Sequence, residues 1–231
     1  MCYNRVSSRA TGSQKQSIEK AGDMAIQAPS FVEEEEQSRM GCRLVAGIDE
    51  VGRGPLAGPV VAAAVILSLV RRPSWLRFVR DSKQLTPRRR DLLFDCIRHD
   101  AVAFGVGSVS HEVIDEQGIV AATKAAMMAA VERLPMRPDF LLIDAVGLPA
   151  LNLPQRSIVK GDAHSLSIAA ASIVAKVTRD RLMAELESLF PGYGLARNKG
   201  YGTPQHLDGL RRLGPCPIHR KTFFPVRELL G

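Results

Sequence analysis

The sequence predicts an α/β domain, because segments with strand character and segments with helical character alternate along it. Short runs of apolar, β-branched residues are typical of buried strands, and apolar residues three and four positions apart are typical of helices that cover a sheet. The chain has 231 residues, 45% hydrophobic and 24% charged, as in ordinary globular proteins. This composition excludes wholesale disorder and fibrous repetition, and the length suffices for a substantial core.

The first part of the domain contains three predicted strands and three predicted helices. The helix at Thr86 has the clearest start, because Thr is a good N-cap and Pro87 suits the first turn. The strands are expected at residues 44–48, 60–67 and 102–109, and the helices at residues 86–97, 111–117 and 120–133.

The second part continues the alternation with two short strands and three helices. The first of these helices is long and rich in alanine, and Pro191 and Gly192 end it. The strands are expected at residues 140–143 and 157–159, and the helices at residues 165–190, 203–213 and 225–230.

Residues 1–39 look like a disordered tail, so the folded unit is expected at residues 40–231. The tail is dominated by polar residues and contains the acidic run Glu33–Glu36, which gives little apolar surface to bury. The whole chain has a net charge of +7. The tail contributes −1, so the folded unit carries +8. A basic body suggests a polyanionic partner.

No apolar run is long enough to span a bilayer, and the N-terminus lacks the apolar core of a signal peptide. We therefore expect a cytoplasmic protein with no membrane partner. The four cysteines are widely spaced and form no Cys-x-x-Cys pair, so they are expected to be reduced thiols without a zinc site.

Four carboxylates follow predicted buried strands: Asp49 and Glu50, then Asp144, then Asp162. Strand ends are where sites form in α/β sheets, and oxygen-rich clusters are what Mg²⁺ or Mn²⁺ require. Adjacent residues of a regular strand face opposite ways, so we expect a bend near Gly47 and Gly52 that brings both acids to one site. The alternative is that each acid caps a turn or helix, with Asp162 capping the helix near Ser165.

The glycines of this region do not form a P-loop or a dinucleotide-binding motif, because the surrounding residues differ from those that either motif requires. Residues 47–54 nearly match a P-loop, but Arg53 and Gly54 replace the required Lys and Ser or Thr. The glycines at 52, 54 and 58 have the wrong spacing for a dinucleotide fingerprint, and a strand-like run follows them instead of a helix.

Basic side chains cluster in two regions and would neutralise phosphates, although a solvated surface is the alternative. Eight lie in residues 71–90 and seven in residues 197–231. Tyr201 stands between two glycines beside these cations, where it could stack on a nucleotide or simply pack in its loop.

Taken together, the segments resemble bacterial ribonuclease HII over roughly residues 43–230. The matching blocks are residues 46–54, 81–85, 142–144, 160–162, 170–180 and 199–201. One departure is Ala169, where the family often has Ser. The resemblance implies an RNase H-like fold: a central mixed β-sheet flanked by α-helices, with a small helical C-terminal region, about residues 197–231, that binds substrate.

The resemblance also implies a metal-dependent endonuclease that hydrolyses the RNA strand of RNA–DNA hybrids. It would incise 5′ of single ribonucleotides in duplex DNA, as in ribonucleotide excision repair, and leave 5′-phosphate and 3′-hydroxyl ends. The four acids map onto Asp49, Glu50, Asp144 and Asp162, which would hold two divalent ions, Mn²⁺ or Mg²⁺. Two ions about 3.5–4 Å apart can activate water and stabilise the leaving oxygen.

The remaining expectations concern substrate contacts and partners. The motif that senses the ribose 2′-hydroxyl maps onto Gly52, Arg53 and Gly54, and the junction-sensing tyrosine resembles Tyr201. Phosphate contacts are assigned to the lysines Lys83, Lys160 and Lys176. We expect a monomer, and the sequence leaves a sliding-clamp partner open.

Two alternative functions fit the sequence less well. A ribonuclease HIII would carry a sizeable N-terminal domain, for which 39 polar residues are too few. A non-catalytic nucleic-acid-binding protein would not place four acids near phosphates, because carboxylates repel phosphate unless cations bridge them.

Overall fold

Five strands form one mixed sheet in the order β3-β2-β1-β4-β5. The structure is a computed structural model, and it describes residues 28–230. The central strand β1 pairs antiparallel with β2 and parallel with β4; β3 and β5 complete the two edges. The strands are β1 (Val45–Val51), β2 (Val60–Ile66), β3 (Ala103–Val109), β4 (Phe140–Asp144) and β5 (Gln155–Ile158).

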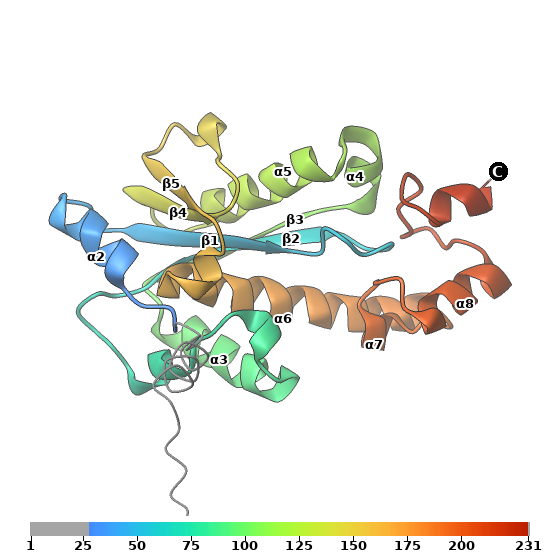
Figure 1. The fold of residues 1–231 in the computed structure, drawn as a ribbon, viewed down its shortest axis with the longest axis horizontal. Helices are drawn as coiled ribbons and strands as arrows, with labels where there is room; N and C mark the ends of the chain where they lie inside the picture. The colour runs from blue at the N-terminus through green and yellow to red at the C-terminus, as the bar shows by residue number, and fades with distance from the viewer. Residues whose placement is uncertain (1–27, 231) are drawn as a thin grey trace, which may run out of the picture.

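Helices cover both faces of this sheet (Figure 1). On one face lie α4 (His111–Gln117) and α5 (Ile119–Glu132), and on the other lie α6 (Leu166–Leu189) and α3 (Pro87–Asp100). Strand β2 is buried at every position, and its side chains alternate between the two cores. Ala63 and Val65 pack toward α6, whereas Ala62 and Ala64 pack toward α5.

Helix α6 lies unusually close to β1, and Gly47 permits the approach. A Cβ at this position would collide with the backbone of Ser167 and Ile168. The expected bend near Gly47 and Gly52 does not interrupt the strand, because β1 stays paired with β2 through Asp49 and Glu50 to Val51. The close approach places the side chains of α6 directly beside the end of β1.

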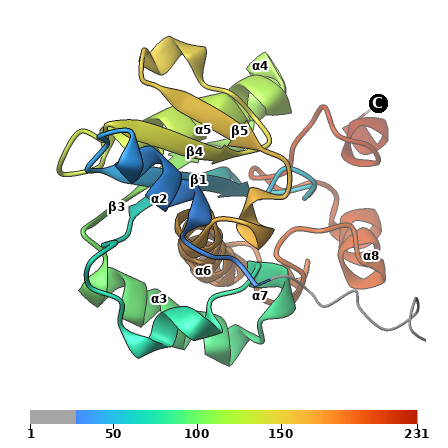
Figure 2. The same cartoon turned by 60° about the vertical axis from the view of Figure 1, so that its left-hand side comes forward.

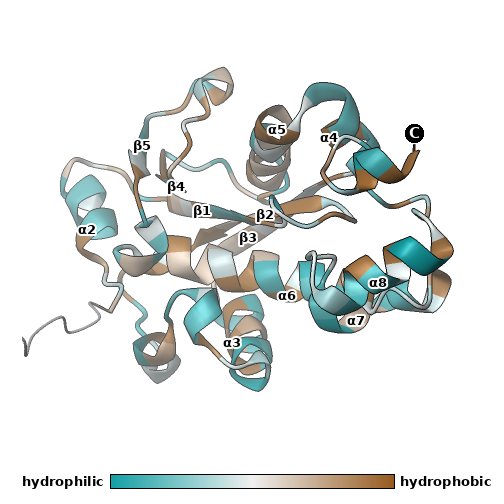
Figure 3. Cartoon of the chain, turned by 45° about the vertical axis from the view of Figure 1, so that its right-hand side comes forward, coloured by the Kyte–Doolittle hydropathy of each residue, from teal (hydrophilic) through white to brown (hydrophobic). Residues whose placement is uncertain are grey.

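The C-terminal region packs on the end of α6 farthest from α2 (Val32–Arg39) (Figure 1). It contains α7 (Leu195–Asn198), α8 (Pro204–Leu213) and the 3₁₀ segment η5 (Val226–Leu230), where an ordinary helix over 225–230 was expected. Its own small core includes Leu56, Met183 and Leu210. Figure 3 shows mostly hydrophilic colour on α2 and on the end of α8. No helix in residues 28–230 combines the length and apolar character that a bilayer span requires.

Most predicted elements are confirmed, with small shifts at their ends. Thr86 caps α3, since its hydroxyl accepts a hydrogen bond from Arg89 N–H at 3.4 Å. Helix α4 has the predicted bounds, and β5 begins two residues earlier than expected. Ser165, not Asp162, caps α6: its hydroxyl accepts from the Ile168 N–H at 3.1 Å. Short 3₁₀ segments that the pattern did not reveal lie at η1 (Ser74–Phe78), η2 (Ser82–Gln84), η3 (Pro149–Leu151) and η4 (Gly161–Ala163).

Helix α2 corrects the expectation of a disordered tail over residues 1–39. Its residues 32–39 are ordered beside the sheet and the start of α6, whereas residues 1–27 lie outside the described part (Figure 2). The reason is Glu34, which is 2% exposed. One of its carboxylate oxygens accepts hydrogen bonds from the Ser165 hydroxyl at 2.6 Å and the Ser167 N–H at 2.8 Å. The acidic run therefore contains a helix cap for α6, which favours negative charge at its N-terminus.

Replacing Glu34 with Ala is expected to lower the free energy of unfolding by about 1–3 kcal/mol, because two donors at the start of α6 lose their acceptor. Urea denaturation would measure this change. Glu36→Ala in the same helix is the control, because its surface ion pair with Arg156 contributes about 0–1 kcal/mol. Equal effects of the two substitutions would contradict the capping role.

Candidate active site

Asp49 and Asp144 lie on neighbouring parallel strands at the edge where both strands end. The register pairs Ile48 with Ile143, so the next position places Asp49 beside Asp144. Asp49 is only 6% exposed. Burial raises the pKa of the Asp49 carboxyl well above its ordinary value, and the charges of Glu50 and Asp144 raise it further. The site therefore holds negative charge that the protein alone stabilises poorly.

Glu50 follows Asp49 on β1 and is partly buried. Its Oε1 accepts an ion-paired hydrogen bond from Arg53 Nη1 at 3.3 Å, and its Oε2 is buried without a partner among the described residues. Burial raises the pKa of the Glu50 carboxyl; Arg53 opposes this shift, and Asp144 adds to it. Adjacent residues of a strand point to opposite faces of the sheet. Asp144 nevertheless lies close enough to Asp49 and Glu50 to raise the pKa of both carboxyls.

Asp162 joins the cluster from the segment between β5 and α6. The Gly161 N–H donates to Oδ1 of Asp144 at 2.8 Å, which ties this segment to the end of β4. Burial raises the pKa of Asp162 to about 6, helped by the charges of Asp81 and Asp144. Asp81 is a fifth carboxylate at the site, and it also accepts a hydrogen bond from the Lys83 N–H at 2.9 Å.

Two buried serines connect the acids to the segment before α3. The Ser82 and Ser172 hydroxyls lie 2.9 Å apart, and Ser172 is close enough to Asp49 to oppose the rise in the pKa of that carboxyl. Lys83 is the cation of this site: burial alone would lower its pKa, but Asp81, Asp162, Asp49 and Asp144 outweigh burial and raise it. The structure therefore places Lys83 among the acids.

The donor set fits a divalent metal by its chemistry. All the acids offer hard carboxylate oxygens, and one buried oxygen of Glu50 has no protein partner among residues 28–230. Within the same residues, no three His, Cys, Asp or Glu side chains form a group that could hold an ion as they stand. The backbone thus brings the acids into one neighbourhood, and their side chains would turn inward to share a cation.

The Gly52-Arg53-Gly54 loop follows β1 directly, and two buried arginines, Arg179 and Arg220, pack against it. Gly52 has a φ of +93°, and a Cβ there would collide with Arg179. Arg220 donates to the carbonyls of Gly52 at 2.5 Å, Arg53 at 2.8 Å and Gly58 at 2.9 Å.

Arg179 completes the support of this loop. It donates to the carbonyls of Pro59 at 2.9 Å, Ala57 at 3.1 Å and Lys199 at 2.8 Å. Both arginines are fully buried, and neither pairs with a carboxylate within residues 28–230. Burial lowers the pKa of Arg179 to about 10 and that of Arg220 to about 9, so both remain cationic near neutral pH.

Tyr201 lies against this loop. It is 43% exposed, and a Cβ added at Gly54 would lie 3.7 Å from its ring. Its carbonyl is hydrogen-bonded to Nδ1 of His206 at 3.0 Å, and His206 Nε2 meets His219 Nε2 at 3.0 Å. Burial lowers the pKa of His206, and burial beside His206 lowers that of His219 to about 4. A neutral histidine pair therefore fixes the tyrosine's backbone.

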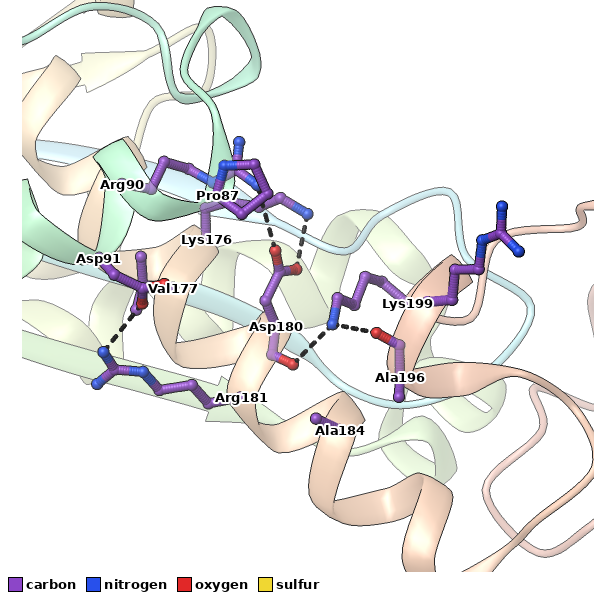
Figure 4. Close-up of a pocket in the computed structure, with 11 residues that line it drawn as sticks. Pro87, Arg90, Asp91, Lys176, Val177, Asp180, Arg181, Ala184, Ala196 and Lys199 are labelled. Carbon is purple, nitrogen blue, oxygen red and sulfur yellow. Dashed lines mark hydrogen bonds and ion pairs between the residues drawn. The ribbon is translucent and has the colours of Figure 1, made fainter.

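The other two predicted lysines lie away from the acids. Lys160 is exposed, has a φ of +56°, and has no side-chain partner within the described part of the chain. Lys176 lines a cavity between α3, α6 and α7, where its Nζ binds Asp180 at 2.7 Å (Figure 4). Neither lysine joins the carboxylate cluster.

The comparisons with known proteins agree with this arrangement. A family model described as "Ribonuclease HII" matches residues 46–226. The ribonuclease HII of Geobacter sulfurreducens is 57% identical over 198 residues, which cover 86% of this chain and 90% of the relative. The chain belongs to the ribonuclease HII family. The enzyme is thus a metal-dependent endonuclease that cleaves RNA in RNA–DNA hybrids and at single ribonucleotides in DNA.

Solved structures confirm the predicted RNase H-like fold of this ribonuclease HII. The ribonuclease H2 of Pyrococcus horikoshii OT3 is 30% identical with a TM-score of 0.69, covering 80% of this chain and 96% of that one. The ribonuclease HII in a PCNA complex from Archaeoglobus fulgidus is 29% identical with a TM-score of 0.67, covering 78% of this chain and 95% of that one.

Several residues of the ribonuclease HII site were missed at the sequence level. The signal for two of them was available, because Ser172, Lys176 and Arg179 lie at helical spacing and follow or interrupt the apolar run in the first half of α6. Asp81 belongs to a block that matched the family, but no strand precedes it directly. Nothing local distinguishes Arg220 or His219 from surface residues, because their burial depends on contacts with the distant Gly52–Gly58 loop.

The raised pKa of Asp162 predicts a pH-dependent loss of stability in metal-free protein. The folded state favours the protonated acid, so stability falls as pH rises from about 4 to about 6. Asp162→Asn removes this titration, so the variant should lose less stability than the wild type as the pH rises. The melting temperature of the variant minus that of the wild type should therefore increase over the same interval. Thermal unfolding in EDTA at several pH values measures the difference. A difference that is constant from pH 4 to pH 7 would contradict the assignment.

Replacing Arg220 with Met is expected to lower the free energy of unfolding by about 3 kcal/mol or more, because several buried carbonyls lose their donor. Chemical denaturation would measure the loss. Arg212→Met provides the control, since Arg212 is exposed and pairs only with Asp208 within the described structure. If the two variants were equally stable, the loop would not depend on Arg220.

Proposed function

We propose that Asp49, Glu50, Asp144 and Asp162 hold two divalent ions, Mg²⁺ or Mn²⁺, with which the enzyme hydrolyses the phosphodiester on the 5′ side of a ribonucleotide. The products would carry 5′-phosphate and 3′-hydroxyl ends. The observation that supports this proposal most strongly is the gathering of buried, poorly compensated carboxylates at the ends of β1 and β4. Such a cluster is unfavourable without cations, and it would become favourable when they bind.

The protein residues prepare this chemistry in distinct ways. Bound divalent ions would lower the pKa of the attacking water and neutralise charge on the leaving oxygen. Ser172 orients the Asp49 carboxylate, and the Gly161 N–H orients that of Asp144. Lys83 lies close enough to four of the acids to supply positive charge for a phosphate at the same site.

The Gly52-Arg53-Gly54 loop is proposed to recognise the ribose 2′-hydroxyl. This hydroxyl distinguishes RNA from DNA, and the exposed Gly54 allows backbone groups to approach it. Arg179 and Arg220 fix the loop from the buried side, so its exposed side keeps one shape. Tyr201, beside Gly54, would stack on the adjoining nucleotide.

The other contacts and partners stay predictions. Lys160 and Lys176 are proposed to contact backbone phosphates outside the metal centre, and residues 197–231 to bind the duplex. We expect a cytoplasmic monomer that acts in ribonucleotide excision repair. The archaeal relative was solved in a complex with PCNA, which makes a sliding clamp a candidate partner of this chain.

Duplex DNA with one ribonucleotide should be incised on the 5′ side of that ribonucleotide only when Mg²⁺ or Mn²⁺ is present. Asp144→Asn should abolish incision and leave duplex binding within a few fold, because it removes a metal ligand without adding bulk. Denaturing gels measure incision, anisotropy measures binding, and calorimetry measures metal uptake. Absence of metal binding in the wild type would instead favour a non-catalytic nucleic-acid-binding protein.

Gly54→Ala should reduce incision at single ribonucleotides by roughly tenfold or more, because the added methyl group obstructs the backbone's approach to the ribose. The fold should tolerate it, since the new Cβ would only contact the Tyr201 ring at 3.7 Å. Incision rates and melting temperatures test both statements. Glu36→Ala serves as a control away from the loop, and normal incision by Gly54→Ala would argue against recognition by this loop.

A further inference from the structure

A basic cavity lies between α3, α6 and α7, beyond the carboxylate cluster. It has a volume of about 530 Å³, and Arg90, Lys176 and Lys199 are among the side chains that line it (Figure 4). The metal ligands proposed above do not line it. Its polar lining comes from α3 and from the α6–α7 region, which are far apart in sequence, so the fold itself assembles the cavity.

The cavity contains more positive than negative charge. Arg181 pairs with Asp91 at 3.0 Å, which leaves Arg90, Lys176, Arg197 and Lys199 facing the single acid Asp180. Asp180 binds Lys176 at 2.7 Å and lies 3.7 Å from Arg90. No carboxylate of the described residues pairs with Arg197 or Lys199.

Backbone carbonyls hold Arg90 and Lys199 in place, and Asp180 holds Lys176. Arg90 donates to the carbonyls of Ser82 at 2.9 Å and Leu85 at 2.6 Å, and Lys199 donates to that of Asp180 at 3.2 Å. Fixed cations in a partly enclosed space bind an anion more strongly than mobile surface lysines do. The arrangement therefore favours a compact, multiply coordinated anion such as a phosphate.

Helix α6 fixes the distance from this cavity to the site of cleavage. Ser172 lies beside Asp49, and Lys176 and Asp180 follow one and two turns later on the same side of the helix. At 1.5 Å per residue these positions are about 6 and 12 Å farther along the axis. A duplex cleaved beside Asp49 would present its neighbouring backbone phosphates at this range.

We propose that this cavity binds one backbone phosphate of the substrate duplex, a few nucleotides from the scissile bond. The proposal rests on the nuclease function above and adds a phosphate position to it. Lys176 and Arg90 would contact the phosphate from the inner side, with Asp180 orienting them, and Arg197 would approach from the rim. The contact would help to set the register of the duplex relative to the metal centre.

The test uses duplexes with one ribonucleotide and one uncharged methylphosphonate, placed in turn at each nearby position of both strands. Binding is measured by fluorescence anisotropy in EDTA, so no cleavage occurs. Wild-type protein should lose about tenfold in affinity at one or two adjacent positions, the equivalent of one charge-assisted contact. Lys176→Met and Arg197→Met should bind the unmodified duplex about tenfold more weakly and no longer respond at those positions.

The matched control is Arg98→Met, which removes one exposed positive charge outside the cavity and outside both basic regions. It should keep the wild-type methylphosphonate profile. Arg197 is exposed and its replacement should not affect folding, so Arg197→Met keeps the test valid if Lys176→Met is unstable. A profile unchanged in Arg197→Met and in any folded Lys176→Met, or a wild-type profile without a sensitive position, would overturn the cavity proposal. Failure to incise the unmodified duplex with Mg²⁺ or Mn²⁺ would instead overturn the nuclease function.

Discussion

Two buried guanidinium groups without carboxylate partners among the described residues hold the substrate side of this enzyme together. Arg179 comes from the sheet-covering helix and Arg220 from the C-terminal region, yet both donate to the carbonyls of one loop after β1. A buried arginine is normally compensated by an acid. Here polar backbone groups perform that task, so the loop must keep its carbonyls turned inward. Gly54 stays exposed in the loop that these contacts hold in place.

The acidic centre beside this loop illustrates the conflict between stability and function. The raised pKa values of Asp49, Glu50 and Asp162 mean that the folded protein is less stable with these groups charged than it would be with neutral side chains. Much of the scaffold around them is apolar and tightly packed, including the fully buried β2. This packing compensates for the acids, and it keeps them close together before any cation arrives.

Periodicity was sufficient to predict most of the secondary structure. The alternation of strands and helices, the Thr86 cap and the bounds of α4 follow from local rules that the sequence displays directly. The acids at strand ends could be identified for the same reason. The role of Glu34 could not, because its charge looks like part of a solvated run until α6 supplies the donors. Arg220 and the His206–His219 pair are similar, because each depends on a partner brought close only by the complete fold.

Helix α6 acts as a rigid spacer that joins these separate features. Its 24 residues span about 36 Å in all, and along its first 21 Å or so lie the cap made by Glu34, the serine beside Asp49 and the arginine beneath the loop. One inserted residue would rotate everything beyond it by about 100° and turn these groups away from their partners. The distance between the carboxylate cluster and the residues proposed to contact the duplex can therefore change only in steps of about one helical turn, because other changes would turn these side chains to the wrong face of the helix. Divergence within this enzyme can change side chains along the helix far more readily than it can change the helix's length.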